Sequence, residues 1–188
     1  ASNVYFDHDN DGVLSKTGWV GQDDALLVWD RNSNGSIDSG AELFGDFTVL
    51  PNGTLAPNGF AALAALDSNS DDILDANDPA FAELKLWRDV AQQGQTGSGE
   101  LISLADAGIV SLSLTNSLKN QNLANGNQLT REGSFTRADG TTSGMGEFCL
   151  AIDTLRFKPG VALADVRESR CWQGATGGAH DPMWRAVA

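Results

Sequence analysis

Side chains that carry oxygen alternate along one short stretch, DRNSNGSIDSGAE, from Asp30 to Glu42. They occupy its first, third, fifth, seventh and ninth positions, and Gly35 occupies the sixth. A hydrated turn accepts the same residues in any order. A chain that wraps a Ca²⁺ ion does not, because an EF-hand loop supplies oxygen from positions 1, 3, 5, 7, 9 and 12 and turns sharply at a glycine in position 6. The stretch therefore predicts a calcium-binding loop.

We name this stretch loop two, because a related loop precedes it. The predicted ligands are the side chains of Asp30, Asn32, Asn34, Asp38 and Glu42 and the main-chain carbonyl of Ser36. Position 12 is Ala41, so Glu42 has to be reached with one additional residue.

Loop three begins at Asp67 and needs fewer adjustments. Its predicted ligands are Asp67, Asn69, Asp71, the carbonyl of Ile73, Asp75 and, at position 12, Asp78. Asp72 replaces the glycine at position 6, and Asp tolerates a left-handed backbone better than most residues.

Loops one and four depart further from the pattern. Loop one offers Asp7, Asp9, Asp11 and the carbonyl of Val13; position 12 is Gly18, so the closing carboxylate is expected from Asp23 or Asp24. Loop four keeps only the first and last carboxylates, Asp89 and Glu100, since Ala91 and Gln93 occupy positions 3 and 5. The sequence thus predicts three to four bound Ca²⁺ ions. An isolated Asp-Asn-Gly match is more often a simple turn, and only the repetition favours metal binding.

The charge of the chain supports cations as ligands. The net charge is −13, and 19 of the 25 acidic residues are Asp, which prefers loops and turns to helices. Fourteen of these Asp lie between Asp7 and Asp89. Such a field disfavours nucleic acid as a partner. No apolar run approaches the roughly 20 residues of a membrane-spanning helix, and the first residues have no signal-peptide layout.

The segments between the loops contain short helix candidates. We predict helices over 23–29, over 59–66 with Asn58 as N-cap, and over 79–87 with Pro79 in the first turn. Residues 46–58 connect a first pair of loops, one and two, to a second pair, three and four.

The second half contains more strand signals. Residues 103–108 are a further short helix candidate, 109–115 alternate as a half-buried strand does, and 148–157 are ambiguous between strand and helix. The predicted fold class is α+β: two pairs of EF-hand-like calcium loops with short helices, followed by a small β-containing second half. We place the module at 1–158 and a flexible or atypical C-terminal tail at 159–188.

Several other residues have ordinary interpretations. Trp19, Trp29 and Trp87 are predicted to be core aromatics, and His8 and His180 to be surface residues. Cys149 and Cys171 lack the spacing of a zinc site, although one disulfide between them stays open.

Taken together, these motifs resemble a known family. The segments that carry the likeness are FDHDNDG, TGWVGQDDALLVWDRNSNGSIDSGAELFGD, NGFAALAALDSNSDDILDANDPAFAELKLWRD, GELISL and NLANGNQLTREGSFTRADGTTSGMGE. They are similar to the calcium-dependent self-processing module of repeat-in-toxin (RTX) proteins, of the FrpC and ApxIVA type. The likeness runs from about Val4 to Phe157.

The resemblance implies a secreted or cell-surface bacterial protein, exported without a cleaved N-terminal signal peptide, in which calcium folds the module. The module then cleaves an Asp-Pro bond just upstream of itself, and the freed aspartyl end can be joined to a lysine of another protein. The implied partners are calcium ions, flanking segments of the same polypeptide and that lysine, with no nucleic acid and no membrane span.

This chemistry has a physical basis. An Asp carboxylate can attack its own main-chain carbonyl and expel the proline nitrogen, a step that proximity favours. The reactive Asp is expected before Ala1. Of the two Asp-Pro bonds present, Asp78–Pro79 closes loop three, and Asp181–Pro182 lies in the tail.

Two other functions remain open from the residues. One is a purely structural calcium module of a secreted RTX protein or adhesin. The other is a dockerin-like partner-binding domain, which the β-rich second half disfavours because paired loops and helices alone would suffice for it.

Overall fold

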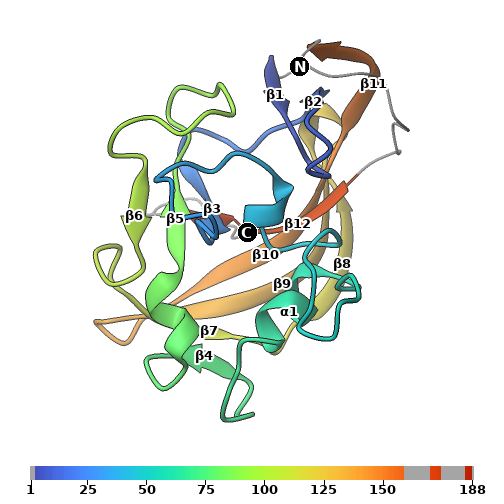
Figure 1. Ribbon diagram of the computed structural model, residues 1–188. Coiled ribbons are helices and arrows are strands. Elements are labelled where there is room, and N and C mark those ends of the chain that lie inside the picture. The colour runs from blue at the N-terminus through green and yellow to red at the C-terminus, as the bar shows by residue number, and fades with distance from the viewer. Residues whose placement is uncertain (1–2, 159–169, 175–184, 188) are drawn as a thin grey trace.

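A computed structural model of the chain describes residues 3–158, 170–174 and 185–187, and within these ranges the protein is mostly β (Figure 1). The described residues form thirteen strands, one six-residue α-helix and three 3-10 turns. Each of the four loops is bordered by at least one strand. The predicted α+β class, with short helices around the loops, is therefore wrong.

A small three-stranded sheet carries loop one. Its order is β1 (Val4–Phe6), β2 (Leu14–Thr17) and β11 (Ile152–Lys158), with antiparallel pairing throughout. β1 and β2 form a hairpin in which Phe6 lies opposite Ser15, so loop one is the turn of this hairpin. The ambiguous segment 148–157 is strand, shared between the end of β10 and β11.

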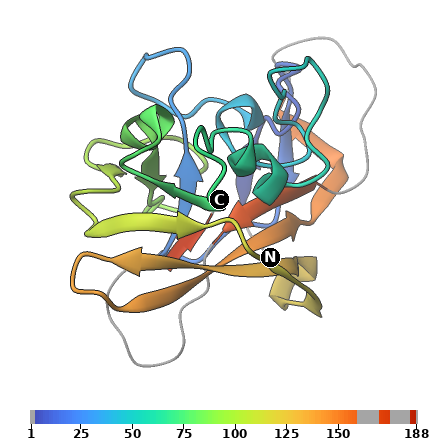
Figure 2. The same cartoon turned by 90° about the horizontal axis from the view of Figure 1, so that it is seen from below.

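The larger sheet has ten strands. Nine follow in the order β4-β7-β9-β10-β12-β13-β3-β5-β6, and β8 pairs with β9 beside this path. Their bounds are β3 Asp24–Val28, β4 Ile73–Asp75, β5 Lys85–Trp87, β6 Leu101–Ser103, β7 Ile109–Ser113, β8 Ser117–Asn122, β9 Gln128–Arg137, β10 Thr142–Leu150, β12 Arg170–Gly174 and β13 Arg185–Val187. Figure 2 shows the long β9–β10 hairpin, coloured gold to orange, along one side of the molecule.

The segment 23–29 forms strand β3 instead of the predicted helix, and the reason lies in the core. Ala25 and Leu27 pack into one hydrophobic cluster, whereas Leu26 and Val28 pack into a second. Alternate residues of a strand point to opposite faces, so a strand buried on both sides is apolar at every position. A short apolar run of this kind does not distinguish strand from helix.

The other predicted helices have mixed outcomes. Residues 79–87 form a 3-10 turn, η2 (Pro79–Glu83), followed by strand β5. In the predicted helix 103–108, Ser103 ends strand β6 and residues 104–108 form a turn. The helix predicted over 59–66 is present as α1 (Gly59–Ala64). There the Asn58 side chain accepts a hydrogen bond of 2.9 Å from the Ala61 N–H, as an N-cap should.

The structure describes two short parts of the predicted tail, and both are strands of the large sheet. β12 pairs with β10 over five residue pairs, and β13 pairs with β3 in parallel. Cys149 is disulfide-bonded, and Cys171, the other cysteine of the chain, lies opposite it in the β10–β12 register. The remainder of 159–188, with His180 and Asp181–Pro182, lies outside the described residues.

Candidate metal centre

The four loops share one backbone shape. Position 4 has a positive φ in every loop: Asn10 57°, Ser33 56°, Ser70 60° and Gln92 54°. Position 6 does as well: Gly12 84°, Gly35 81°, Asp72 63° and Gly94 67°. L-residues seldom adopt this conformation, so its recurrence at the same two positions shows that all four loops make the same tight turn.

One hydrogen bond closes this turn in each loop. The first carboxylate accepts from the N–H at position 6, in the pairs Asp7–Gly12 at 2.9 Å, Asp30–Gly35 at 2.9 Å, Asp67–Asp72 at 3.0 Å and Asp89–Gly94 at 2.7 Å. The N–H at position 5 donates to the same carboxylate in loops one, two and four. The position-1 aspartates therefore shape the backbone as well as offering oxygen.

Loop one brings three carboxylates together. Asp7, Asp9 and Asp11 have ligand atoms within 4.8 Å of one another, and in the described part of the chain no other set of three carboxylate, His or Cys groups does so. Burial raises the pKa of Asp7, against the hydrogen bonds from Gly12 and Asp11. The arrangement concentrates negative charge where a cation would relieve it.

Neither residue expected to close loop one belongs to this cluster. Asp24 accepts the Gly21 N–H at 3.0 Å, and Asp23 forms an exposed ion pair with Arg88 at 3.2 Å. Position 12 itself leaves no room for a side chain, since a Cβ on Gly18 would lie 2.0 Å from the Asn127 Oδ1.

Loop two has a buried carboxylate oxygen with no partner. Glu42, at the end of 3-10 turn η1 (Gly40–Glu42), is 3% exposed, and its Oε2 accepts the Asp38 N–H at 2.8 Å. Its Oε1 is buried and makes no hydrogen bond within the described residues, although the nearby Asn32 N–H favours the ionised carboxylate. Burial raises the pKa of Glu42. A buried acceptor without a donor is costly, and a cation beside it would remove that cost.

The amides of loop two surround a further carboxylate. Asn32 and Asn34 donate to the Asp38 Oδ2 at 3.3 and 2.6 Å, so positions 3, 5 and 9 converge. The 3-10 turn η1 accommodates the additional residue before Glu42. The hydroxyl of its N-cap, Ser39, accepts the Ala41 N–H at 3.3 Å.

Loop three is closed by Asp78, which is 1% exposed. Its carboxylate accepts the Ser68 N–H at 2.7 Å, the Ser68 hydroxyl at 2.8 Å and the Asp75 N–H at 3.1 Å. These bonds, chiefly that from the Ser68 N–H, lower the pKa of Asp78, so the group stays ionised. Asp67, Asn69 and Asp71 each accept a main-chain N–H of the loop as well.

Loop four has donors of a different kind. The Trp19 indole N–H donates to Asp89 at 2.9 Å, and the Trp87 indole N–H reaches Glu100 at 3.4 Å. Glu100 also accepts from Gly97 at 2.7 Å and Val90 at 3.1 Å. The loop keeps the shared backbone, and two indole groups meet its two carboxylates.

The loops pair only in part as their order in the sequence predicts. Ile37 at position 8 of loop two donates its N–H to the Thr96 Oγ1, position 8 of loop four, at 2.8 Å. Loop one joins this pair, because the Gly40 N–H donates to the Asp7 carbonyl at 2.8 Å. Loop three lies elsewhere, with its β4 paired to β7. Loops one and two are thus in contact, as predicted, but loop four joins them instead of pairing with loop three.

An aromatic core lies beneath this cluster. Phe6 packs against Trp19 and Trp87 with ring centroids 5.4 and 5.9 Å apart, and the two tryptophans lie 5.6 Å apart. Both tryptophans are buried, as predicted, and Trp29 is partly buried. The prediction that His8 is a surface residue is wrong: it is 2% exposed and contacts Phe6 edge to face at 5.3 Å, because loop one folds over the core.

Sequence reasoning missed the residues that hold the loops from outside. Trp19, Trp87 and Thr96 carry no motif, and their contacts join segments far apart in the chain. The one signal available was the position of Thr96, eighth in a loop of calcium type, where paired loops meet.

These observations define the class of protein. It is a β-rich module built around four loops of EF-hand-like shape. The SPM domain family matches residues 1–151, and the chain belongs to this family. It is similar to the iron-regulated protein FrpA of Neisseria meningitidis serogroup C, with 52% identity over 164 residues. That match covers 86% of this chain and 15% of the relative, so the chain spans a small part of that protein's length. None of the helices in the described ranges is long and apolar enough to cross a membrane.

Proposed function

We propose that the module binds three Ca²⁺ ions, in loops one, two and three, and folds when they bind. The observation that carries this proposal is the buried Oε1 of Glu42, which makes no hydrogen bond within the described residues at the site where loop two needs its closing ligand. The proposed side-chain ligands of loop two are Asp30, Asn32, Asn34, Asp38 and Glu42, with the Ser36 carbonyl. Those of loop one include Asp7, Asp9, Asp11 and the Val13 carbonyl, and those of loop three are Asp67, Asn69, Asp71, the Ile73 carbonyl, Asp75 and Asp78.

Loop four has a different proposed role. Asp89 and Glu100 were predicted as ligands, but indole and main-chain N–H groups already donate to both carboxylates. The proposed ligands of loops one to three also accept N–H groups, so the distinguishing feature of loop four is that Ala91 and Gly97 offer no side-chain oxygen at positions 3 and 9. We therefore assign loop four as the metal-free partner on which loop two is built, through Ile37 and Thr96.

Charge explains why folding would depend on the ions. Folding brings Asp7, Asp9 and Asp11 together and buries Glu42, so it concentrates negative charge in the first half of the chain. Bound calcium supplies the positive charge, and its binding free energy then becomes folding free energy. Such a module would stay unfolded where calcium is scarce and fold after export to a calcium-rich exterior, which fits a secreted or cell-surface protein.

The proposed activity is cleavage of an Asp-Pro bond upstream of the module. The Asp carboxylate oxygen attacks the main-chain carbonyl carbon of the same residue, the bond to the proline nitrogen breaks, and that nitrogen takes up a proton. A five-membered cyclic anhydride remains. The ε-amine of a lysine then attacks the anhydride, forms an isopeptide bond, regenerates a carboxylate and releases a proton.

The place of β1 supports this activity. Val4 and Phe6 are each 1% exposed, and the strand runs directly into Asp7, whose carbonyl accepts the Gly40 N–H. Ordering loop one therefore fixes the chain just after the segment that precedes the module. Holding that segment in one conformation raises the rate of an intramolecular attack.

A chain extended upstream through its native Asp-Pro bond tests the proposal. Calcium should release a fragment that begins with proline, read by intact mass, and replacing the upstream Asp with Ala should abolish the cleavage. In the same extended chain, Asp30→Ala should slow it. Calcium binding without cleavage would favour a purely structural module, and loss of the last seven residues at Asp181–Pro182 would place the reactive bond on the wrong side.

A further inference from the structure

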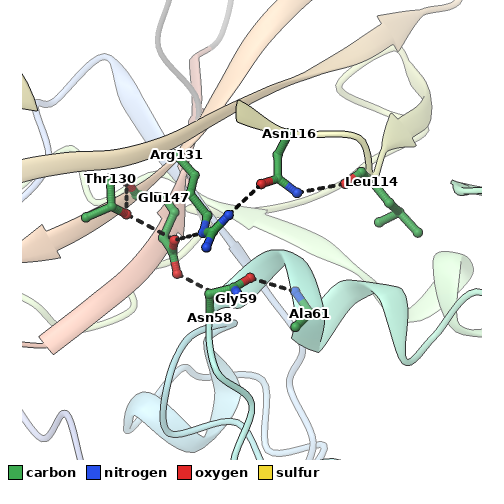
Figure 3. Close-up of polar contacts among 8 residues, drawn as sticks. All are labelled: Asn58, Gly59, Ala61, Leu114, Asn116, Thr130, Arg131 and Glu147. Carbon is green, nitrogen blue, oxygen red and sulfur yellow. Dashed lines mark hydrogen bonds and ion pairs between the residues drawn. The ribbon is translucent and has the colours of Figure 1, made fainter. Parts of the chain in front are cut away.

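An ion pair with a buried carboxylate joins β9 and β10 in the second half of the chain (Figure 3). Glu147 of β10 is 1% exposed, and its Oε2 lies 3.4 Å from the Arg131 Nε of β9. The same carboxylate accepts the Thr130 hydroxyl at 3.0 Å through Oε2 and the Gly59 N–H at 2.9 Å through Oε1. Both carboxylate oxygens thus have donors, and the donors come from two separate elements.

One branch of this network leads to the start of loop three. Gly59 is the first residue of α1, and the neighbouring Asn58 caps the helix through the Ala61 N–H. At the other end of this helix, the Asp67 N–H donates to the Ala64 carbonyl at 3.3 Å. The position of α1 therefore sets the position of the first carboxylate of loop three.

The other branch leads to the middle of loop three. The Arg131 Nη1 donates to the Asn116 Oδ1 at 3.0 Å, and the Asn116 Nδ2 donates to the Leu114 carbonyl at 3.0 Å. The Leu114 N–H then donates to the carbonyl of Asp72, the position-6 residue of the loop, at 3.0 Å. One buried pair is thus joined by hydrogen bonds to both the entry and the turn of loop three.

Packing fixes the helix against the same strand. A Cβ placed on Gly133 of β9 would lie 2.7 Å from the Phe60 ring, so α1 rests directly on β9. Phe60 is 2% exposed. A side chain at Gly133 would displace the helix, and the hydrogen bond from Gly59 to Glu147 depends on this close approach.

We propose that Glu147, supported by Arg131, is a positioning residue that holds both flanks of loop three in the shape that binds the ion. The inference rests on the proposed calcium site in loop three and adds the residues that preorganise it. Partners of this outer kind commonly change metal affinity by roughly 10- to 100-fold when removed.

Hydrogen exchange of single main-chain amides in the calcium-loaded full chain tests this role. The Asp72 amide reports opening of loop three, and the Gly35 amide, at the same position, reports loop two. Glu147→Gln should accelerate exchange at Asp72 by about tenfold or more relative to Gly35. The matched control is Glu132→Gln, which removes an exposed pair with Lys119 from β9 and should change neither amide.

The outcomes separate this inference from the proposed function. If protection of Asp72 in the unaltered chain does not rise with calcium concentration, loop three binds no calcium and the proposed function fails there. If it does rise, but Glu147→Gln changes Asp72 no more than Gly35, the positioning role is wrong. Should Glu147→Gln not fold, Asn116→Ala, which breaks only the branch to Leu114, must accelerate Asp72 selectively, or the inference is overturned.

Discussion

Loops two and four have the same backbone shape, but different groups surround their carboxylates. Both have a positive φ at positions 4 and 6, both close on a position-1 aspartate, and in both the final glutamate accepts the N–H at position 9, at 2.8 Å for Glu42 and 2.7 Å for Glu100. In loop four the carboxylates also meet the indole N–H groups of Trp19 and Trp87. In loop two the Glu42 Oε1 makes no hydrogen bond within the described residues.

This difference shows that the loop shape and the need for an ion are separate properties. Main-chain N–H groups folded around one aspartate are sufficient to define the shape. In loop two, the buried carboxylate oxygen that makes no hydrogen bond is the group that a cation would stabilise. In loop four, indole N–H groups of the core donate to the carboxylates. In loop two, a bound cation would stabilise the Glu42 carboxylate instead.

Removal of calcium is expected to have the largest effect. Each ion at about a hundred times its Kd stabilises the folded state by about 2.7 kcal/mol, so three contribute about 8 kcal/mol, comparable with the roughly 5–15 kcal/mol that holds a domain together. A chelator should therefore abolish the near-ultraviolet circular dichroism of the buried tryptophans, and added calcium should restore it. An unchanged spectrum would mean that all four loops are satisfied internally, as loop four is.

Substitution of the first aspartate should separate the two loops. Asp30→Ala should reduce the number of bound ions from three to two, measured by equilibrium dialysis. Asp89→Ala should leave three ions bound, but it orphans the buried Trp19 and Gly94 donors and should lower the free energy of unfolding by about 3 kcal/mol. If Asp89→Ala bound one ion fewer than the unaltered chain, loop four would be a calcium site.

Trp19→Phe tests the indole donor directly. It keeps most of the ring but removes the N–H that reaches Asp89, which is 1% exposed. We expect a loss of about 1–2 kcal/mol in denaturant unfolding at fixed calcium. Trp29→Phe is the matched control, because Trp29 is a partly buried tryptophan whose ring packs against the Arg31 guanidinium. Equal losses from both would show that the indole N–H contributes nothing specific.

Part of this arrangement was predictable from the sequence. The ligand spacing located all four loops, and Asn58 with the apolar run after it located α1, because both signals are local. The strand β3 was not predictable in the same way. Its residues are buried on both faces, in two hydrophobic clusters whose other members come from distant parts of the chain. Only tertiary packing decides between strand and helix for so short a run.

The pairing of the loops was hidden for a related reason. The similar spacing of loops one and two and of loops three and four favoured pairing between loops that are neighbours in sequence. Loop two instead contacts loop four, from Ile37 to Thr96, across 59 residues. The second-half residues Arg131 and Glu147 have no motif of their own. Their role emerges only when β9 and β10 bring them under α1.

Calcium binding by loop two should depend on pH. Burial raises the pKa of Glu42 above its ordinary value of 4.5, so the calcium-free loop keeps a proton there to a higher pH. Calcium needs the carboxylate, so affinity is complete above the raised pKa and falls as the pH drops through it. Calorimetry in buffers of different ionisation enthalpy should show proton release when calcium binds, and Glu42→Gln should reduce this release.

The smallest expected effect concerns the contact between the two loops. Thr96→Val keeps the shape of the side chain but removes the oxygen that accepts the Ile37 N–H, and Ile37 is 2% exposed. If loop four is the support on which loop two closes, the weakened contact should cost the ion-bound state about 1 kcal/mol, which raises the Kd of loop two about fivefold. Thr54→Val, in an exposed turn where the hydroxyl donates to Asn52, should leave that Kd unchanged. If Thr96→Val also leaves it unchanged, the two loops share a backbone shape without acting as a pair.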